Sequence, residues 1–222
     1  MRTAALIAAA LFSSTALAAA PAPVPAGAPG HWSIATGETV SPDRDAISFE
    51  MGWPGLIFGY AHGLSDRSDV GFKIALLYSL ENTNTNAFGA GADVPFRLVV
   101  NRREKVSLGL HIEPGVRVYT RNLPGAASRS DFLTRFPVGG ILGIQATPEL
   151  RIGASADLVM AINWTHTQFF EIGPQFGLGA EYSVDKNLLV GLTGHFGPQF
   201  YSYSNSPTDF AFTTEIVVGY RM

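Results

Sequence analysis

The sequence contains no cysteine, which excludes a disulfide framework and a thiol that acts as a nucleophile or carries a lipid anchor. Beyond its first residues it also lacks the apolar run of about 20 residues that a transmembrane helix needs. Neither sign of charge dominates, because 15 Lys and Arg stand against 18 Asp and Glu. Without a basic surplus to neutralise a phosphate backbone, no nucleic-acid partner is expected. Because 46% of the residues are nevertheless hydrophobic, their spacing becomes the main structural signal.

The N-terminus has the three parts of a secretory signal peptide. Arg2 supplies the positive charge, residues 4–12 form an apolar core, and residues 16–18, Ala-Leu-Ala, match a small-residue cleavage site. The apolar core is too short to cross a membrane as a helix. Residues 1–18 are therefore expected to direct export through the general secretory route and to be removed ahead of Ala19.

A leader rich in proline, alanine and glycine follows the signal peptide. Between Pro21 and Gly30 the chain consists mainly of proline and small residues, which favour an extended and unpacked conformation. We therefore assign residues 19–45 to a periplasmic leader and residues 46–222 to one folded domain, since a β-barrel of this length forms a single unit.

Apolar and polar residues alternate through that domain. From Val106 to Val118 every second residue is valine, leucine, isoleucine or proline, and the residues between them include histidine, glutamate and arginine. A period of two places the two sets on opposite faces of a strand. The pattern recurs over residues 150–164 and 209–222. These segments exceed the roughly 9 to 11 residues with which a tilted strand crosses a bilayer, whereas strands of soluble proteins average about 5 to 6.

Turn-forming residues divide the domain into ten expected strands. Short charged turns at 65–69, 101–105, 147–149 and 185–187 alternate with longer polar loops at 81–87, 121–131 and 202–208, although the connection at 165–168 is short. This asymmetry is typical of barrels with short periplasmic turns and longer extracellular loops. The expected strands cover residues 46–53, 56–64, 70–80, 87–100, 106–120, 132–146, 150–164, 169–184, 188–201 and 209–222.

The first hairpin allows a second interpretation. If Trp53-Pro54-Gly55 is a bulge and not a turn, residues 32–39 become the first strand and residues 46–64 the second. The count stays at ten in that case. Eight strands is the alternative count.

The export signal, the alternation, the turn asymmetry and the terminal strand together resemble the small outer-membrane β-barrels of Gram-negative bacteria, the class of the OmpA- and OmpX-like barrels. The resemblance covers about residue 46 to the end. It implies an all-β fold, a transmembrane antiparallel up-and-down β-barrel in the cell outer membrane. The expected partners are outer-membrane lipids, lipopolysaccharide and the barrel assembly machinery, while the ligand of the extracellular loops is left open. In that class an aromatic residue commonly ends the last strand, whereas this chain has Phe212 and Tyr220 at outward positions and ends in Met222.

Aromatic residues gather near the expected ends of the strands. Such girdles mark both membrane interfaces of outer-membrane barrels, although aromatic residues also favour strands in general. The outward positions near the expected extracellular ends are Trp53, Tyr78, Phe88, Trp164, Phe170, Phe200 and Phe210. Those near the other rim are Phe72, Phe96, Tyr182 and Tyr220.

Charged residues of the opposite parity are expected inside the barrel. Acids and bases are nearly balanced there, and a network of pairs is expected because an unpaired charge out of water is costly. A selectivity lining for small solutes is the alternative. Glycines on the same face, such as Gly143 and Gly179, leave space for long side chains and permit curvature. The expected lumen set is Glu50, Lys73, Asp93, Arg97, Glu113, Arg117, Arg135, Arg151, Asp157, Glu171, Glu181, Glu215 and Arg221.

Glu113 and Arg117 illustrate how this network is expected to form. Both point inward from one strand, about 13 Å apart at roughly 3.3 Å per residue, which is too far for direct contact. Each must therefore pair across neighbouring strands, where Arg97, Arg135 and Asp93 are the nearest inward charges in sequence order.

No residue pattern predicts catalysis, a metal or a cofactor. His166 lies in an expected loop, His195 faces inward, and His62 and His111 fall in the periplasmic half, without a neighbouring Ser-Asn or Asp partner motif. Neither these histidines nor His31 have the spacing of metal ligands. The run Gly89-Ala-Gly91 lies in a strand pattern and is followed by no helix, so it is not a phosphate loop.

The sequence therefore favours a non-enzymatic barrel with a structural or surface-interaction role. A narrow passive channel for small solutes is the alternative. A lipid-modifying enzyme or a protease is less favoured.

Overall fold

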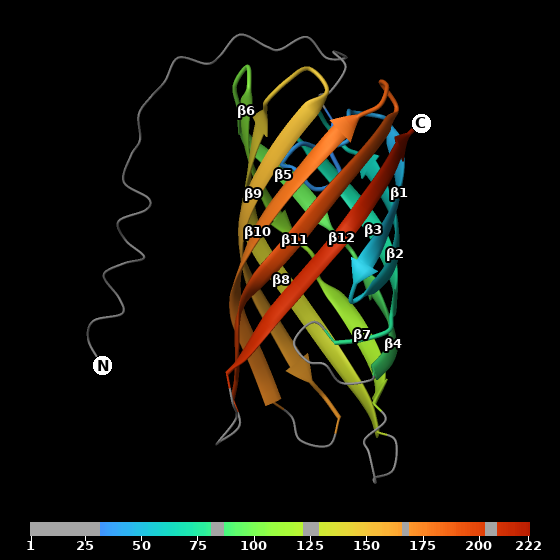
Figure 1. The fold of residues 1–222 in the computed structure, drawn as a ribbon, viewed down its shortest axis with the longest axis vertical. Coiled ribbons are helices and arrows are strands. Elements are labelled where there is room, and N and C mark those ends of the chain that lie inside the picture. Colours follow the sequence, from blue (N-terminus) through green and yellow to red (C-terminus); the bar gives the residue numbers. More distant parts are fainter. Residues whose placement is uncertain (1–31, 81–86, 122–128, 166–168, 203–207) are drawn as a thin grey trace, which may run out of the picture.

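The computed structural model describes residues 32–80, 87–121, 129–165, 169–202 and 208–222. They form a closed antiparallel β-barrel whose strands tilt against its long axis (Figure 1). Among the described residues, no helix is long and apolar enough to cross a membrane. The strand segments are β1 (Asp45–Trp53), β2 (Gly55–Gly63), β3 (Ser68–Leu77), β4 (Ala87–Asp93), β5 (Phe96–Arg102), β6 (Val106–Ile112), β7 (Gly115–Arg121), β8 (Arg129–Gln145), β9 (Leu150–Asn163), β10 (Phe169–Ser183), β11 (Leu188–Tyr201) and β12 (Asp209–Arg221).

Two of the expected strands are each divided at a proline. β4 and β5 are separated at Pro95, and β6 and β7 at Pro114. Proline has no N–H to donate to a sheet ladder, and the regular pairing is interrupted at these two positions, whereas Pro137, Pro174 and Pro198 lie within unbroken strands. Each pair of halves still runs as one strand, because β3 pairs with both β4 and β5, and β8 pairs with both β6 and β7. The barrel thus has the ten expected strands.

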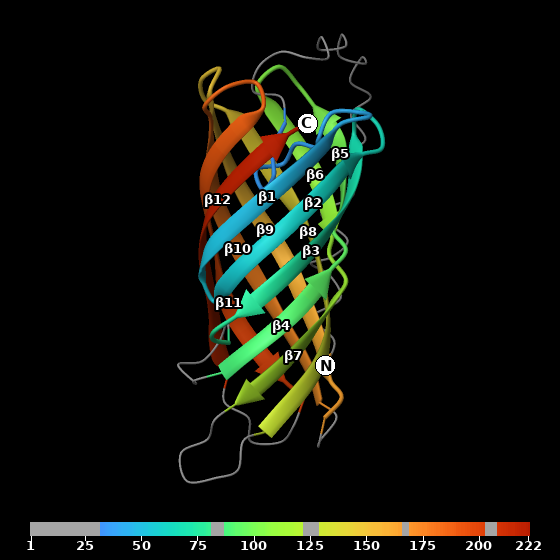
Figure 2. The same cartoon turned by 90° about the vertical axis from the view of Figure 1, so that its right-hand side faces the viewer.

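The sheet closes between its first and last strands. β1 and β12 pair from Ala46 with Arg221 to Trp53 with Thr214, as seen where they lie side by side in Figure 2. Consecutive strands are neighbours throughout, which confirms the up-and-down order. β1 and β2 are joined by Pro54 alone and pair with each other, so the first hairpin turns there and the alternative with a first strand at 32–39 is wrong.

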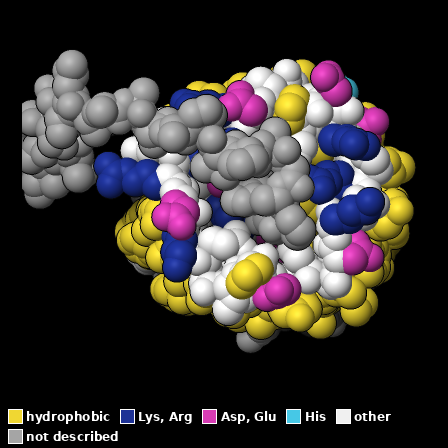
Figure 3. Space-filling view, turned by 90° about the horizontal axis from the view of Figure 1, so that it is seen from above, with side chains coloured by type: hydrophobic (Ala, Val, Ile, Leu, Met, Phe, Trp, Pro, Cys, Tyr) yellow, Lys and Arg dark blue, Asp and Glu magenta, His cyan; other side chains and the backbone are white. Residues whose placement is uncertain are grey.

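The outer face of the barrel is apolar. Leu110, Leu178 and Leu192 are 50%, 63% and 57% exposed, whereas the neighbouring inward residues Ser107 and Arg117 are buried. Seen from one end, hydrophobic side chains form the outer margin and charged side chains lie around the mouth (Figure 3). Large apolar side chains are normally withdrawn from water, so this distribution fits a barrel surrounded by hydrocarbon.

The two ends of the barrel differ. At one end, called here the short-turn end, β1 begins, β12 ends, and the turns at residues 64–67, 103–105, 146–149 and 184–187 connect the strands. In the last of these turns, Asp185 accepts hydrogen bonds from the backbone N–H groups of Asn187 and Leu188, which lowers the pKa of its carboxyl. The expected loops at 81–87, 121–131 and 202–208 belong to the opposite end and fall largely outside the described residues.

The aromatic residues lie on the outer face near both rims. Trp53 is half-buried and meets the ring of Tyr78 edge to face, with 5.8 Å between the ring centroids. Of the expected aromatic residues, those exposed at the opposite end are Tyr78, Phe88, Trp164, Phe170, Phe200 and Phe210. Those nearer the short-turn end are Phe72, Phe96, Tyr182 and Tyr220.

Residues 32–44 are the described part of the expected leader. They precede β1 but lie at the short-turn end, where residues 32–40 are almost all buried within the barrel. Residues 19–31 of the leader and the signal peptide lie outside the described residues. We call residues 32–40 the strap.

Candidate functional site

The strap fills the lumen at the short-turn end. Trp32 is 2% exposed and Val40 is fully buried, and both pack with Ala46 and Leu189 on the inner side of the barrel. Polar residues occupy the middle of the strap, where Ser33, Thr36, Glu38 and Thr39 are also buried. A buried polar segment needs hydrogen-bond partners, and the barrel supplies them.

Glu181 of β10 binds the first half of the strap. One carboxylate oxygen accepts the backbone N–H groups of Ile34 and Ala35 at 3.0 and 2.9 Å, and the other accepts the hydroxyl of Thr36. The carboxylate is itself buried, and a buried charge is costly without such donors. The strap amides therefore solvate Glu181 inside the lumen.

Arg97 of β5 binds the same part of the strap from another side. Its guanidinium donates to the carbonyl of Ser33 at 3.0 Å and to the carbonyl of Ile34. It also forms a two-pronged pair with Asp69, at 2.8 and 2.6 Å. Asp69 in turn accepts the backbone N–H of Val40 at 2.8 Å, so this ion pair holds both ends of the strap.

Glu38 anchors the middle of the strap between two arginines. Arg102 Nε donates to one of its carboxylate oxygens and Arg151 Nη2 to the other, each at 3.0 Å. Arg151 Nε also donates to the carbonyl of Thr36 at 3.1 Å, and the Ser107 hydroxyl donates to the carbonyl of Gly37 at 2.8 Å. Charge-assisted hydrogen bonds of this kind are the strongest available to side chains.

Glycines of the barrel wall make room for the strap backbone. A Cβ at Gly143 would lie 2.2 Å from the Thr36 carbonyl oxygen, and one at Gly153 would lie 3.0 Å from Thr36 Cα. Within the strap, Gly37 has a φ of 85°, in the left-handed region that favours glycine. The inward glycines thus accommodate a chain segment as well as the long side chains that the sequence indicates.

A second group of charges lies farther from the short-turn end. Lys73 Nζ is 3.5 Å from a carboxylate oxygen of Glu50 and 3.6 Å from one of Glu113. Arg117 donates to both oxygens of Asp93, at 2.7 and 2.6 Å. Glu113 and Arg117 therefore have separate partners on other strands, as expected.

The observed partners of Glu113 and Arg117 agree only in part with the three charges that lie nearest to them in sequence order. Arg117 pairs with Asp93, which was one of the three expected candidates, and Arg135 interacts electrostatically with Glu113. Arg97 instead pairs with Asp69, and the ion pair of Glu113 is with Lys73.

The remaining expected lumen charges are distributed along the barrel. Asp157 lies 2.9 Å from His111 Nε2 and accepts the Ser155 hydroxyl at 2.9 Å. Glu171, at the opposite end, accepts the amide of Gln199 at 2.6 Å.

Arg221 and Glu215 complete the expected set. Arg221 donates to the Ser41 hydroxyl at 2.8 Å, and its guanidinium carbon lies 5.4 Å from the centre of the Trp32 ring. Glu215 lines the cavities described below.

Three charged residues in or beside the strap are absent from the expected lumen set. Asp69 and Arg102 were assigned to turns and Glu38 to the leader, where strand parity says nothing about orientation. Asp69 and Glu38 are nevertheless 1% and 2% exposed. Asp69 is the second residue of β3 and Arg102 the last residue of β5, whereas Glu38 lies in no strand, so a position at the end of a strand was a signal for the first two only.

Two cavities of about 140 Å³ each lie in the lumen beyond the strap. One includes Ile34 and Ala35 of the strap in its wall, and the other reaches Pro54 and Leu77 near the opposite end. Since a water molecule occupies about 30 Å³ of liquid, each cavity has room for a few waters. The residues common to both walls are Glu50, Lys73, His111, Glu113, His195 and Glu215.

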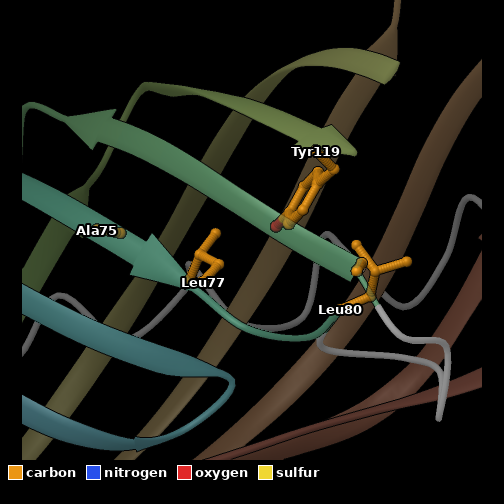
Figure 4. Close-up of a cluster of buried hydrophobic side chains, with 5 residues drawn as sticks. Ala75, Leu77, Leu80 and Tyr119 are labelled. Atoms are coloured by element: carbon orange, nitrogen blue, oxygen red, sulfur yellow. The ribbon is translucent and has the colours of Figure 1, made fainter. Parts of the chain in front are cut away.

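An apolar cluster lines the lumen toward the opposite end. Leu77, Leu80 and Tyr119 lie close together between β3 and β7, with Ala75 and Ala87 beside them (Figure 4). Ile57 and Leu133 pack against this cluster. The lumen thus changes from a polar mouth at the strap, through a charged middle, to an apolar wall.

Two histidines, His111 and His195, line both cavities, whereas His62 lies apart from them. His62 Nδ1 lies 2.8 Å from Asp45 at the short-turn end, and His195 lies 3.5 Å from the hydroxyl of Thr213. His31 and His166 fall outside the described residues. Across the described ranges, no group of three or more histidine, aspartate or glutamate residues is arranged to hold a metal ion.

The closed sheet, the apolar outer face and the polar interior define an integral-membrane β-barrel, in agreement with the resemblance to small outer-membrane barrels. Neither a protein-family model nor a curated protein matches the sequence. Similar solved structures include the outer membrane protease OmpT from Escherichia coli, at a TM-score of 0.47 and 10% identity over 83% of this chain and 98% of that one. They also include the KdgM porin, at a TM-score of 0.34 and 13% identity over 80% of this chain and 97% of that one.

Proposed function

We propose that this protein is a non-enzymatic barrel of the outer membrane with a structural or surface-interaction role, and that its lumen does not conduct while the strap is in place. The observation that carries the proposal is the buried strap. It is held in the mouth by Glu181, Arg97 and Arg151. A mouth filled by protein gives hydrated ions no continuous path.

Two features support a location in the outer membrane, namely the outer surface of the barrel and the N-terminal sequence. The apolar outer face with aromatic rims suits contact with outer-membrane lipids and lipopolysaccharide. The signal-like N-terminus supports export by the general secretory route, with insertion by the barrel assembly machinery. The short-turn end then faces the periplasm.

The polar groups of the lumen support a structural role over catalysis. The Ser155 hydroxyl donates to the carboxylate of Asp157 and not to a histidine ring, so it is not activated as a nucleophile. Arg117 and Asp93 are buried, and both Nη atoms of the arginine donate to the carboxylate. Paired charges of this kind link neighbouring strands, which supports a structural role.

A narrow channel is the second candidate, because the lumen contains the two cavities described above. Planar-bilayer recording of the purified full-length chain separates the candidates. The proposal expects no unitary current steps from barrels whose folding is verified by a shift in gel mobility between unheated and boiled samples. Steady ion-selective steps from the parent chain would contradict it.

Lipid analysis addresses the enzymatic alternative. A deletion strain and its parent are expected to have the same lipopolysaccharide and phospholipid species. A modified lipid that disappears on deletion and returns with the wild-type chain would establish catalysis and refute the non-enzymatic role.

A further inference from the structure

We infer that the strap is a removable plug, and that its withdrawal converts the barrel into a pore for small hydrated ions. The inference rests on the proposed function in one respect, namely that the barrel with its strap in place is closed.

The strap is a ligand of the barrel and not a part of its sheet. β1 begins at Asp45, after the strap, and pairs with β12 and β2 along its length. Within the described barrel every strand has its neighbours without any contribution from residues 32–40. Since the hydrogen bonds between strands close the barrel, loss of the strap leaves that closure in place.

The attachment of the strap is mainly polar, so water can replace it. Glu181, Arg97 and Arg151 hold strap amides and carbonyls with side-chain hydrogen bonds. These groups lie in the mouth and are hydrated once the strap has left, which removes the cost of burying them. The apolar anchors of the strap are Trp32, Val40 and Ile34, which packs against the same cluster.

The wall behind the strap leaves an opening when the strap is withdrawn. Gly143 and Gly153 face the strap, where a Cβ would lie 2.2 Å from the Thr36 carbonyl oxygen and 3.0 Å from Thr36 Cα respectively. As glycines they have no side chain with which to fill the vacated volume. Ile34 and Ala35 form part of the wall of the first cavity. Their departure therefore joins that cavity to the periplasmic solvent.

The path continues through a charged lining. The first cavity shares Glu50, Lys73 and Glu113 with the second, which reaches Pro54 and Leu77 near the opposite end. Side chains of both signs that water reaches are typical of pores for small hydrated ions. Conduction thus requires removal of the strap and no change in the barrel sheet.

A single substitution in the wall tests the plug without altering the strap. The three atoms nearest to a Cβ at Gly153 all belong to Thr36, at 3.0 to 3.2 Å. Gly153→Leu is therefore expected to push the strap out of the mouth. Gly140 of β8 is the control for a leucine added to the barrel away from the strap, since it faces outward and a Cβ there meets ordinary contacts at 3.5 and 3.8 Å, the second with the exposed side chain of Leu110.

The measurement is single-channel recording of full-length chains in planar bilayers with potassium chloride. Unitary steps are expected from Gly153→Leu and not from the parent chain or from Gly140→Leu. Deletion of residues 32–40 is expected to conduct as well, whereas deletion of residues 22–30 is expected to stay silent. A synthetic peptide of residues 32–40, added on the short-turn side, is expected to block the strap-deleted barrel.

The outcomes separate the two proposals. Steps from the parent chain equal to those of the strap deletion would refute the closed state of the proposed function. A silent parent together with folded, heat-modifiable and silent Gly153→Leu and strap-deleted barrels would overturn the plug alone. Failure of both variants to fold would show that the strap is an integral part of the barrel and would overturn the plug as well.

Discussion

Arg151 and Glu38 form a hydrogen-bonded ion pair at 3.0 Å, although 113 positions separate them in the chain. Arg151 belongs to β9 and Glu38 to the strap, so the pair joins a segment that precedes the barrel to the barrel wall. Both residues are at most 5% exposed. The contact makes the leader part of the folded structure.

Replacing Glu38 by alanine is expected to destabilise the barrel by about 1 to 4 kcal/mol, because the buried Arg151 loses its carboxylate partner. The lower part of the range applies because Glu38 also pairs with Arg102. The Arg102 side chain is 21% exposed, so water can replace the lost carboxylate there. Urea unfolding in lipid vesicles measures the change. Glu104→Ala, at an exposed turn position, should lie within about 0.5 kcal/mol of the parent. Equal stability of the Glu38 and Glu104 variants would contradict the role of the pair.

Replacing Arg117 by alanine is expected to cost about 3 to 5 kcal/mol, because Asp93 would remain as a buried charge without its partner. Arg117→Lys keeps the charge but loses the two-pronged geometry, and should fall between the alanine variant and the parent. The same unfolding assay applies. An alanine variant as stable as the parent would mean that water enters freely at this pair.

Replacing Val116 by arginine is expected to destabilise the barrel through a different cost. Val116 faces outward and is 39% exposed, so the new charge meets hydrocarbon, at about 2 to 4 kcal/mol near the bilayer midplane. Thr120 points outward from the same strand but lies nearer the rim, where an arginine costs about 0 to 1 kcal/mol. If Val116→Arg were as stable as Thr120→Arg, the assignment of faces on β7 would be wrong.

Replacing Glu181 by alanine is expected to loosen the strap without opening the sheet. Hydrogen exchange monitored by mass spectrometry should show faster exchange at Ile34 and Ala35, whose N–H groups lose their acceptor. Glu171→Ala is the matched control, because this glutamate lies on the same strand at the far end of the lumen. Unchanged exchange at Ile34 in the Glu181 variant would show that the strap is held by its other contacts.

The sequence by itself determined the parity of the strands. Leu110 faces outward and Arg117 inward because successive side chains of a strand alternate, which is a local rule. The turn-forming segments likewise determined the strand count, and short turns of charged residues marked the short-turn end. The missing N–H of proline does not by itself predict the splits at Pro95 and Pro114, because Pro137, Pro174 and Pro198 lack it as well and lie within unbroken strands.

The tertiary structure alone decided which inward residues meet. Lys73 of β3 reaches Glu113 past the strand formed by β4 and β5, because the narrow lumen brings side chains of non-neighbouring strands together. The strap was equally beyond prediction, because the sequence indicates a leader over residues 32–40, or alternatively a first strand over residues 32–39, and neither interpretation places them in the lumen. Their burial depends on space left by wall glycines and on charges such as Glu181, which come from distant parts of the chain and meet only when the sheet closes.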